Sequence, residues 1–412
     1  MGAGGHGRAA FAFIFVTVVI DMLALGVIVP VLPRLIEAFQ GGDTASAATW
    51  VGVFGTVYAG MQFLFSPVLG SLSDRYGRRR VILLSCAGLG VDYLLMAGAP
   101  SLGWLLLGRV ISGITSSTYG TASAYIADVT PPEQRAAKFG MLGVAFGVGF
   151  IIGPTVGGLL AGYSLRAPFW GAAILSLANT AYGFFVLPES LPEDRRSPFH
   201  WKSANPAGAL ALLRAHPHLP ALAFAGFLSM LAHDAAPSTF VLYTTWRYGW
   251  TAQTVGLVLA LVGVASMIVQ GGLVGRIVSA LGERRALAVG FAAGMVSDLM
   301  FGLAATGAWF VAGIPVSAFY GVASPALQSM MTRLVGPEEQ GRLQGAQGSL
   351  MGIASMTAPL LFTQAFAAAI GPYRSWNLPG IPFLIAAGLL AVALVVARRA
   401  VAHPEASPAG VQ

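Results

Sequence analysis

The chain has 412 residues, of which 56% are hydrophobic and only 9% are charged, and its formal net charge is +7 at pH 7. A soluble domain carries roughly 25% charged residues, so a soluble fold of this size could not cover its surface. The composition therefore excludes an ordinary soluble domain and favours a protein whose apolar side chains face lipid.

Twelve mostly apolar runs follow one another along the chain, each long enough to span a bilayer as a helix of roughly 20 residues. Backbone polar groups in lipid must bond internally, and the runs are too long and unalternating for barrel strands. The first run is also too long for a cleaved signal peptide. We therefore predict an all-α membrane protein with twelve transmembrane helices. The runs cover residues 10–32, 49–70, 81–99, 103–125, 139–162, 167–187, 218–243, 251–275, 286–305, 309–330, 346–369 and 380–397.

Asp21 lies in the middle of the first run, where a charged side chain needs an explanation. A charge at the bilayer centre costs roughly 2.5–3.5 kcal/mol on insertion scales, so such residues are usually paired or functional. The other charges within the runs are Asp92, Arg109, Asp234 and Asp298. All five are candidates for proton coupling or substrate binding.

The segment Gly70-Ser-Leu-Ser-Asp-Arg-Tyr-Gly-Arg-Arg-Arg80 follows the second run. Gly70 and Gly77 permit a tight turn and close helix approach, and Asp74 can accept hydrogen bonds from Arg78 or a helix N-terminus. The segment resembles the loop signature of the major facilitator superfamily, G-x-L-x-D-R-x-G-R-R. The resemblance implies the fold of two six-helix bundles and a latch that stabilises the outward-facing state; a purely topogenic basic loop is the alternative. The latch residues are Gly70, Asp74, Arg75, Gly77, Arg78 and Arg79.

Asp92 lies in the outer half of the third run and Arg109 in the outer part of the fourth. The two helices run antiparallel, so the charges lie at similar depth and can form an ion pair. Asp92 is either a partner in this structural pair or a proton site. Arg109 lies in Gly108-Arg-Val-Ile-Ser-Gly113, which resembles the fourth-span motif of the superfamily, whose arginine is linked to proton coupling.

Glycines recur at a spacing of four in the fifth run, which places them along one helix face where a neighbouring helix can approach closely. Pro154 removes one backbone hydrogen bond and allows a bend. The string G-x-x-x-G-P-x-x-G-G resembles the antiporter motif of drug/proton exporters, which importers usually lack; simple helix packing is a compatible interpretation. The motif consists of Gly143, Gly147, Gly149, Gly153, Pro154, Gly157 and Gly158.

A hydrophilic stretch over residues 188–217 divides six runs from six, and it is predicted to be a cytoplasmic linker because about 30 residues cannot bury a core. The predicted domains are a six-helix bundle over residues 1–187 and a second over 218–412. Two loops repeat between them at one offset of 205 residues. Duplicated halves, with a substrate site between them, are typical of secondary transporters. Gly70, Gly77, Arg79, Arg80, Pro132, Glu133 and Gly140 match Gly275, Gly282, Arg284, Arg285, Pro337, Glu338 and Gly345.

Within the superfamily the sequence resembles bacterial tetracycline/proton antiporters along nearly the whole chain. This resemblance implies that Asp21, Asp74, Asp92 and Arg109 are essential and that Gln270 lines the site. The stretches that carry it include Asp21 to Pro33, Val91 to Leu95, Arg247-Tyr-Gly-Trp250, Pro325-Ala-Leu-Gln328 and Leu343-Gln-Gly345.

Two positions depart from those antiporters, because Ser266 replaces a histidine and Gly294 replaces an aspartate. Asp298 lies one turn beyond Gly294, where it can substitute on the same helix face. Asp234 lies near the middle of the seventh run beside His233, and whether either residue enters the transport cycle stays open. The substrate is therefore tetracycline or a related amphipathic drug or metabolite.

Lysine and arginine are distributed unequally if the N-terminus is cytoplasmic. The outer side then holds Arg34, Arg166, Arg247 and Arg374, Arg109 lies within a run, and the rest of the 23 lie on the cytoplasmic side. The positive-inside rule predicts cytoplasmic termini, and the basic excess needs no nucleic-acid partner.

No nucleotide-binding loop, metal-ligand cluster or catalytic motif is found, so we expect neither a cofactor nor an enzyme. The predicted function is proton-coupled export of an amphipathic drug by alternating access. The alternatives are a major facilitator importer or exporter of a small metabolite, and a membrane enzyme or sensor. The expected protein is a monomer in the bacterial inner membrane, with a small-molecule substrate, protons and the lipid bilayer as its partners.

Overall fold

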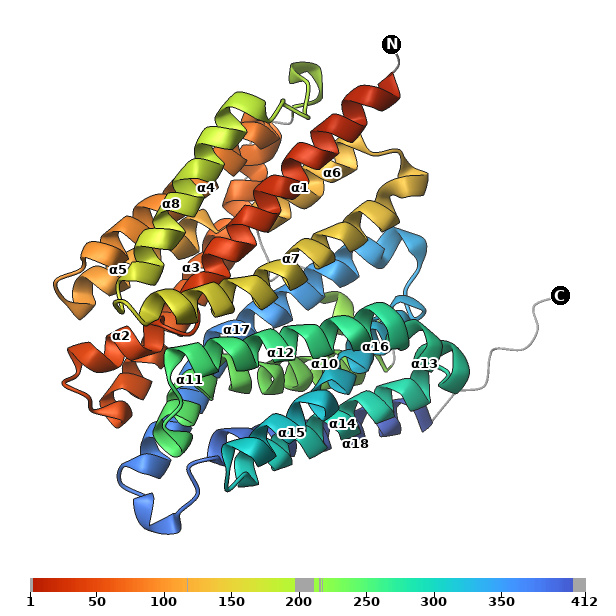
Figure 1. Ribbon diagram of the computed structural model, residues 1–412. Helices are drawn as coiled ribbons and strands as arrows, with labels where there is room; N and C mark the ends of the chain where they lie inside the picture. Colours follow the sequence, from red (N-terminus) through yellow and green to blue (C-terminus); the bar gives the residue numbers. More distant parts are fainter. Residues whose placement is uncertain (1–2, 117, 197–210, 215, 217, 403–412) are drawn as a thin grey trace. The chain divides into compact units, whose positions relative to one another are not determined.

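The computed structural model describes residues 3–116, 118–196, 211–214, 216 and 218–402 (Figure 1). These residues form helices joined by short connections, with no strand among them. The chain divides into two compact units. The first comprises Met1–Asn205 and Val241–Val264, and the second comprises Pro206–Phe240 and Ala265–Gln412. Of the predicted linker, residues 197–210, 215 and 217 lie outside the described residues.

The first unit is built mainly from the helices that precede the predicted linker. They are α1 (Ala3–Ile28), α2 (Leu32–Phe39), α3 (Thr44–Tyr76), α4 (Arg78–Gly98), α5 (Leu102–Thr115), α6 (Thr118–Val129), α7 (Pro132–Ala161), α8 (Ala167–Val186) and the 3-10 helix η1 (Glu193–Arg195). Most residues of α11 (Ala235–Tyr248) and α12 (Ala252–Ile268) also belong to this unit. The first unit therefore contains helices from both sides of the predicted linker.

The second unit contains the remaining helices. They are η3 (Ala211–Arg214), α10 (Leu219–His233), the π-helix η4 (Val269–Leu273), α13 (Val274–Leu281), α14 (Glu283–Leu303), α15 (Gly307–Ala318), η5 (Phe319–Val322), α16 (Ala323–Thr332), η6 (Pro337–Glu339), α17 (Gln340–Ile370), η7 (Arg374–Trp376) and α18 (Ile381–Ala402). The η elements other than η4 are short 3-10 helices.

Eleven single helices or runs of two or three successive helices among the described residues are long and apolar enough to cross a membrane. The fourth predicted run is not one of these, because it is divided between α5 and α6, and each of the two is too short by itself. Taken together, these two helices occupy the fourth predicted span. The all-α fold with twelve spans is therefore confirmed, while the exact domain boundaries remain a prediction.

Helix α1 lies beside α7 in the first unit (Figure 1). Glycines bring their backbones close: a Cβ atom added to Gly153 would lie 2.7 Å from the Cα atom of Gly26. The apolar core around α1 contains Ile14, Val18 and Ile82, each fully or almost fully buried. Close packing of this kind is the main attraction between helices in lipid, where apolar burial gives little.

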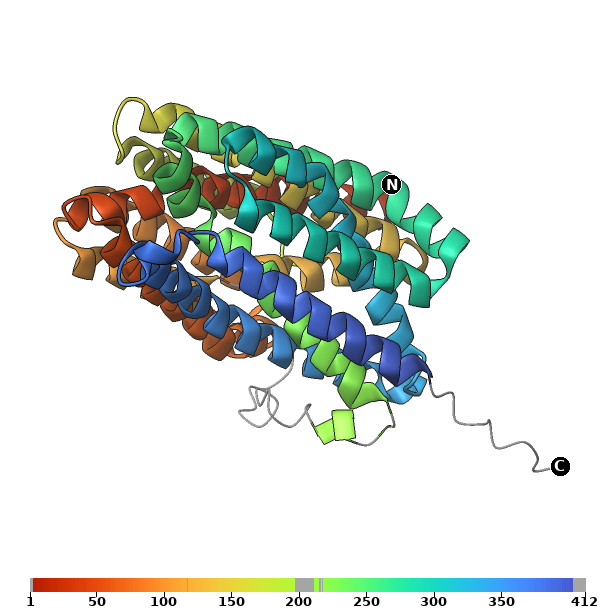
Figure 2. The ribbon, with the colours of Figure 1, turned by 90° about the horizontal axis from the view of Figure 1, so that it is seen from below.

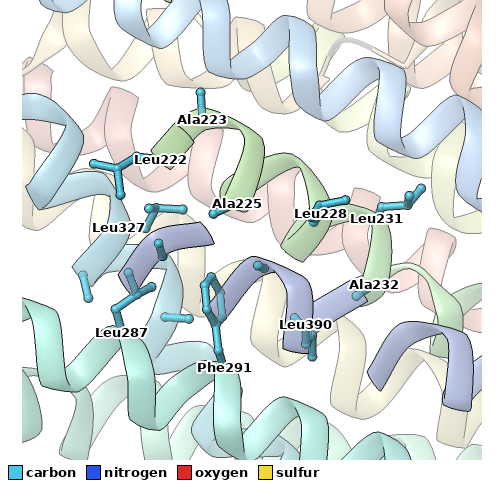
Figure 3. Packing of buried hydrophobic residues seen from close by; sticks show 14 of the residues in the cluster. Leu222, Ala223, Ala225, Leu228, Leu231, Ala232, Leu287, Phe291, Leu327 and Leu390 are labelled. Carbon is cyan, nitrogen blue, oxygen red and sulfur yellow. The ribbon is translucent and has the colours of Figure 1, made fainter. Parts of the chain in front are cut away.

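The core of the second unit is formed by α10, α14, α16 and α18 (Figure 3). Leu222, Phe291, Leu327 and Leu390 are buried there. Helix α10 lies beside α18, which also packs along α14 (Figure 2). This packing fixes the helices from which the polar residues of the second unit project.

The two copies of the first repeated loop, which contain Gly77 and Gly282, adopt similar backbone conformations. Gly77 has φ +101° and ends α3, and Gly282 has φ +74° and ends α13. Positive φ values strain any residue with a Cβ atom, so both positions favour glycine. The repeat found in the sequence thus corresponds to a shared turn between the second and third, and the eighth and ninth, spans.

Candidate functional site

A buried ion pair joins α4 and α5 in the first unit. Nη2 of Arg109 donates to Oδ2 of Asp92 over 3.0 Å, and their side chains are 8% and 0% exposed. The same nitrogen lies 3.2 Å from Sδ of Met96. The predicted pair is therefore present. Oδ1 of Asp92 and Nε of Arg109 have no hydrogen-bond partner among the described residues, so each can still bind another polar group.

Tyr58 of α3 lies next to this ion pair and connects it to the break between α5 and α6. The guanidinium carbon of Arg109 lies 5.5 Å from the centre of the Tyr58 ring. The Tyr58 hydroxyl is 2.9 Å from Oγ of Ser116, which also accepts a hydrogen bond from Gln62. Ser116 has non-helical backbone angles and ends α5. Polar side chains from two helices thus meet where the fourth span is interrupted.

Asp21 projects from α1 and is 4% exposed. Its Oδ1 atom has no hydrogen-bond partner among the described residues. Tyr58 is within electrostatic reach of Asp21, Asp92 and Arg109, so these charges belong to one region of the unit. Burial of a carboxylate without a cationic partner costs free energy in lipid, and this cost falls when the carboxylate binds a proton or a cation.

In the second unit, polar residues gather at breaks in the seventh and tenth spans. Asp234 separates α10 from α11, and it lies within hydrogen-bonding reach of Ser355 in α17. The ring of His233 lies 5.8 Å from that of Tyr320, centre to centre. The Tyr320 hydroxyl lies 2.5 Å from Oγ of Ser229 and 2.6 Å from its carbonyl oxygen. Tyr320 lies in η5, between α15 and α16.

Gln270 and Asp298 approach the same region from two further spans. Gln270 lies in the π-helix η4, and a Cβ atom on Gly321 would lie 3.2 Å from its Cγ atom. Asp298, in α14, makes no hydrogen bond or ion pair with another described residue, and both it and Asp234 are within electrostatic reach of Tyr320. Interrupted helices and π-bulges often mark functional sites in membrane transporters.

The loop after α3 forms a charge network. Arg78 pairs with Asp74, donates from Nε to Oδ2 of Asp128 over 3.2 Å, and donates to Oγ of Ser73. Its backbone N–H donates to Oε1 of Glu189 over 2.9 Å. A Cβ atom on Gly77 would overlap that carboxylate. Arg78 is thus the centre of the network.

The other members of the predicted latch lie at the edge of this network. Arg79 donates to the carbonyl oxygen of Phe184, and the guanidinium of Arg75 lies 5.1 Å from the centre of the Tyr76 ring. Gly70 was expected to allow close helix approach, but a Cβ atom there would meet nothing within 4 Å. Gly70 therefore makes no close helix contact in this structure.

The fifth-span motif packs against two different helices. Gly149, Gly153 and Gly157 face α1, where a Cβ atom on Gly149 would lie 2.5 Å from Cβ of Met22. Gly158 faces α12, and a Cβ atom there would lie 2.6 Å from the carbonyl oxygen of Ala252.

Two members of the motif need separate description. Pro154 contacts both neighbours: a Cβ atom on Gly26 of α1 would lie 3.1 Å from its ring Cδ, and a Cβ atom on Gly256 of α12 would overlap its carbonyl oxygen. A Cβ atom on Gly143 would meet nothing within 4 Å, so the glycine face that packs closely on α1 consists of Gly149, Gly153 and Gly157 and makes no close contact at Gly143. Gly147 is half-buried.

Arg78→Gln is expected to weaken the latch, because it leaves Asp74 and Asp128 without their shared cation. A charge-assisted hydrogen bond contributes about 1.5–3 kcal/mol, so we expect transport to fall at least tenfold with the protein still folded. Arg80→Gln is the matched control, since Arg80 is exposed and has no partner among the described residues. Equal transport by both variants in vesicles would contradict the role of Arg78.

Several of these residues were not predicted from the sequence. Asp128, Glu189 and Tyr58 come from distant parts of the chain and show no local motif. Gln62 and Ser116 could have been found from the sequence, because they are polar residues inside apolar runs. Polar side chains in lipid need hydrogen-bond partners, so such residues are candidates for contacts between helices.

Comparisons with known proteins agree with this architecture. The model of the Major Facilitator Superfamily matches residues 14–359 and 222–411. The "Tetracycline resistance protein, class C" of Escherichia coli is 38% identical and the class G protein of Vibrio anguillarum is 37% identical; both matches cover 95% of this chain, and 96% and 98% of the relatives. The human organic anion transporter MFSD10 has a similar fold, with a TM-score of 0.70 and 24% identity over 95% of this chain and 99% of that one. The chain therefore belongs to the Major Facilitator Superfamily, in the group that includes the tetracycline resistance proteins.

Proposed function

We propose that this protein is a proton-coupled exporter of an amphipathic drug, with tetracycline as the first candidate substrate. One observation carries the proposal: Asp21 and Asp92 are buried inside the first unit, and each has a carboxylate oxygen without a partner among the described residues. Carboxylates held in this way can bind and release a proton as their access to water changes. The names of the relatives give the substrate class.

Each residue has a proposed role. Asp21 and Asp92 carry the proton, and Arg109 holds Asp92 in place and balances its charge. Gln270, Asp234 and Asp298 form the substrate-facing polar group of the second unit. The network around Arg78 is the conformational latch, and the glycines of α7 allow the close packing that such a helix needs.

The wider arrangement follows from these roles. We infer a monomer in a bacterial inner membrane with both termini in the cytoplasm, on the side where most lysine and arginine residues lie. The six-helix bundles are proposed to cover residues 1–187 and 218–412. Transport is driven by the proton gradient with no chemical conversion of the substrate, so the protein is not proposed to be an enzyme.

Uptake of tetracycline by energised inverted vesicles tests the proposal. Vesicles that hold the wild-type protein should accumulate the drug, and a proton uncoupler should abolish the uptake. Asp21→Asn vesicles with equal amounts of folded protein should show no energised uptake. Uptake that persists with the uncoupler would contradict proton coupling. Failure with tetracycline but uptake of another drug from a panel would replace tetracycline as the substrate and keep the proposal of proton-coupled drug export.

A further inference from the structure

The repeated loop of the second unit contains an ion pair with reversed polarity. At the offset of 205 residues, Arg78 corresponds to Glu283 and Asp128 corresponds to Arg333. Arg78 pairs with Asp128 in the first unit, and Arg333 pairs with Glu283 over 2.8 Å in the second. Ser329 also donates to Glu283 over 2.6 Å. Both copies therefore keep an ion pair at the same place, with the charges exchanged.

This reversal leaves the second loop with an excess of positive charge. In the first loop, Asp74, Asp128 and Glu189 all contact Arg78, and Arg79 has a carbonyl acceptor. In the second loop, Ser279 stands where the first has Asp74, and Glu283 is already paired with Arg333.

Arg284 and Arg285 follow Glu283 directly at the start of α14. Both are exposed, and neither forms a hydrogen bond or ion pair with another described residue. The second loop thus presents cations that the described part of its own unit does not neutralise.

Arg284, Arg285 and Arg333 line a concavity of about 600 Å³. Its other lining residues are Val278, Ser279, Leu281, Gly282 and Glu283. The concavity lies where α13 ends and α14 begins, at the ends of two spanning segments and therefore at the level of lipid headgroups. Leu281, which lines the concavity and is 39% exposed, provides apolar surface there.

We propose that this concavity binds the phosphate headgroup of an anionic phospholipid. Phosphate pairs well with guanidinium groups, which donate hydrogen bonds in a planar fork. Basic pockets between spanning helices are a known setting for acidic headgroups. The adjacent apolar surface favours a lipid over a free anion, because acyl chains can cover Leu281. The bound headgroup would supply to the second loop the negative charge that Asp74 and Glu189 supply to the first.

Native mass spectrometry of the purified full chain, titrated with phosphatidylglycerol, tests the proposal. Each arginine near a surface contributes about 1 kcal/mol to the binding of acidic lipid, so Arg284→Gln/Arg285→Gln should weaken the apparent affinity about 30-fold. Glu283→Gln should strengthen it several-fold, because Arg333 loses its competing partner. Arg398→Gln/Arg399→Gln, which removes two exposed arginines near the end of α18, is the matched control and should change the affinity little.

The same experiment distinguishes binding of a lipid headgroup from binding of free phosphate. Inorganic phosphate at ten times the lipid concentration should not displace phosphatidylglycerol, and phosphatidylethanolamine should bind more weakly. Displacement by inorganic phosphate would replace the proposal with a free-anion site. An equal loss in the control variant would reduce it to general attraction between a basic protein and acidic lipid. Either result would overturn the lipid site and leave the proposed transport function unaffected.

Discussion

Gly157→Ala should yield little folded protein, while Gly143→Ala in the same helix and the same motif should behave like wild type. The added Cβ atom at Gly157 would overlap the carbonyl oxygen of Val27, which belongs to the backbone of α1 and cannot rotate away. Overpacking in a tight interior costs about 1–3 kcal/mol, and more when the backbone must move. Because helices in lipid are held mainly by such packing, α1 and α7 should separate.

Thermal unfolding of the detergent-purified variants, together with their yields, measures this difference. Gly143 is a strict control because its side of the helix is open, and alanine gains roughly 0.8–1 kcal/mol of helix propensity over glycine. Gly143→Ala is thus expected to be neutral or slightly stabilising. Equal losses in both variants would mean that the glycines are needed for flexibility throughout α7. Equal stability in both would mean that α1 does not approach Gly157 so closely.

The sequence was sufficient to predict the spans because hydropathy is a property of 20 neighbouring residues, and packing hardly changes it. It also predicted the pair between Asp92 and Arg109, because successive spans run antiparallel and the positions of the two residues place them at a similar depth in the membrane. Asp74 lies near the end of α3 and Arg78 begins α4, four residues later. This short spacing was enough to predict their contact. Each of these predictions needed only local order and the direction of the helices.

The remaining features depend on contacts between distant segments. Asp128 and Glu189 reach Arg78 from 50 and 111 residues away, and no local pattern marks them as partners. The interruption at Ser116 and the π-helix at Gln270 vanish in a hydropathy average. The glycine spacing predicted close approach but did not identify α1 as the neighbour, because a pattern within one helix does not say which other helix packs against it.

The pairing of Asp92 with Arg109 allows its structural and functional roles to be separated. Arg109→Ala is expected to destabilise the protein strongly, because Asp92 is 0% exposed and would be left as an uncompensated charge. Removal of one partner from a buried pair costs about 3–5 kcal/mol. Arg109→Lys keeps the charge but loses the planar guanidinium group that lies near the Tyr58 ring, so it should recover only part of the stability.

The double variant Asp92→Asn/Arg109→Gln should regain most of the stability while transport stays at least a hundredfold below wild type. Without both charges no buried group is left unbalanced, and replacement of a buried pair by neutral side chains is often tolerated. The proton site at Asp92 would be lost, however, so energised uptake into vesicles should not return. Recovery of both stability and uptake would make the pair purely structural and would leave Asp21 as the proton carrier of the first unit. Recovery of stability alone would place the pair in the coupling step, because side chains that only held helices together would be dispensable once the fold was restored.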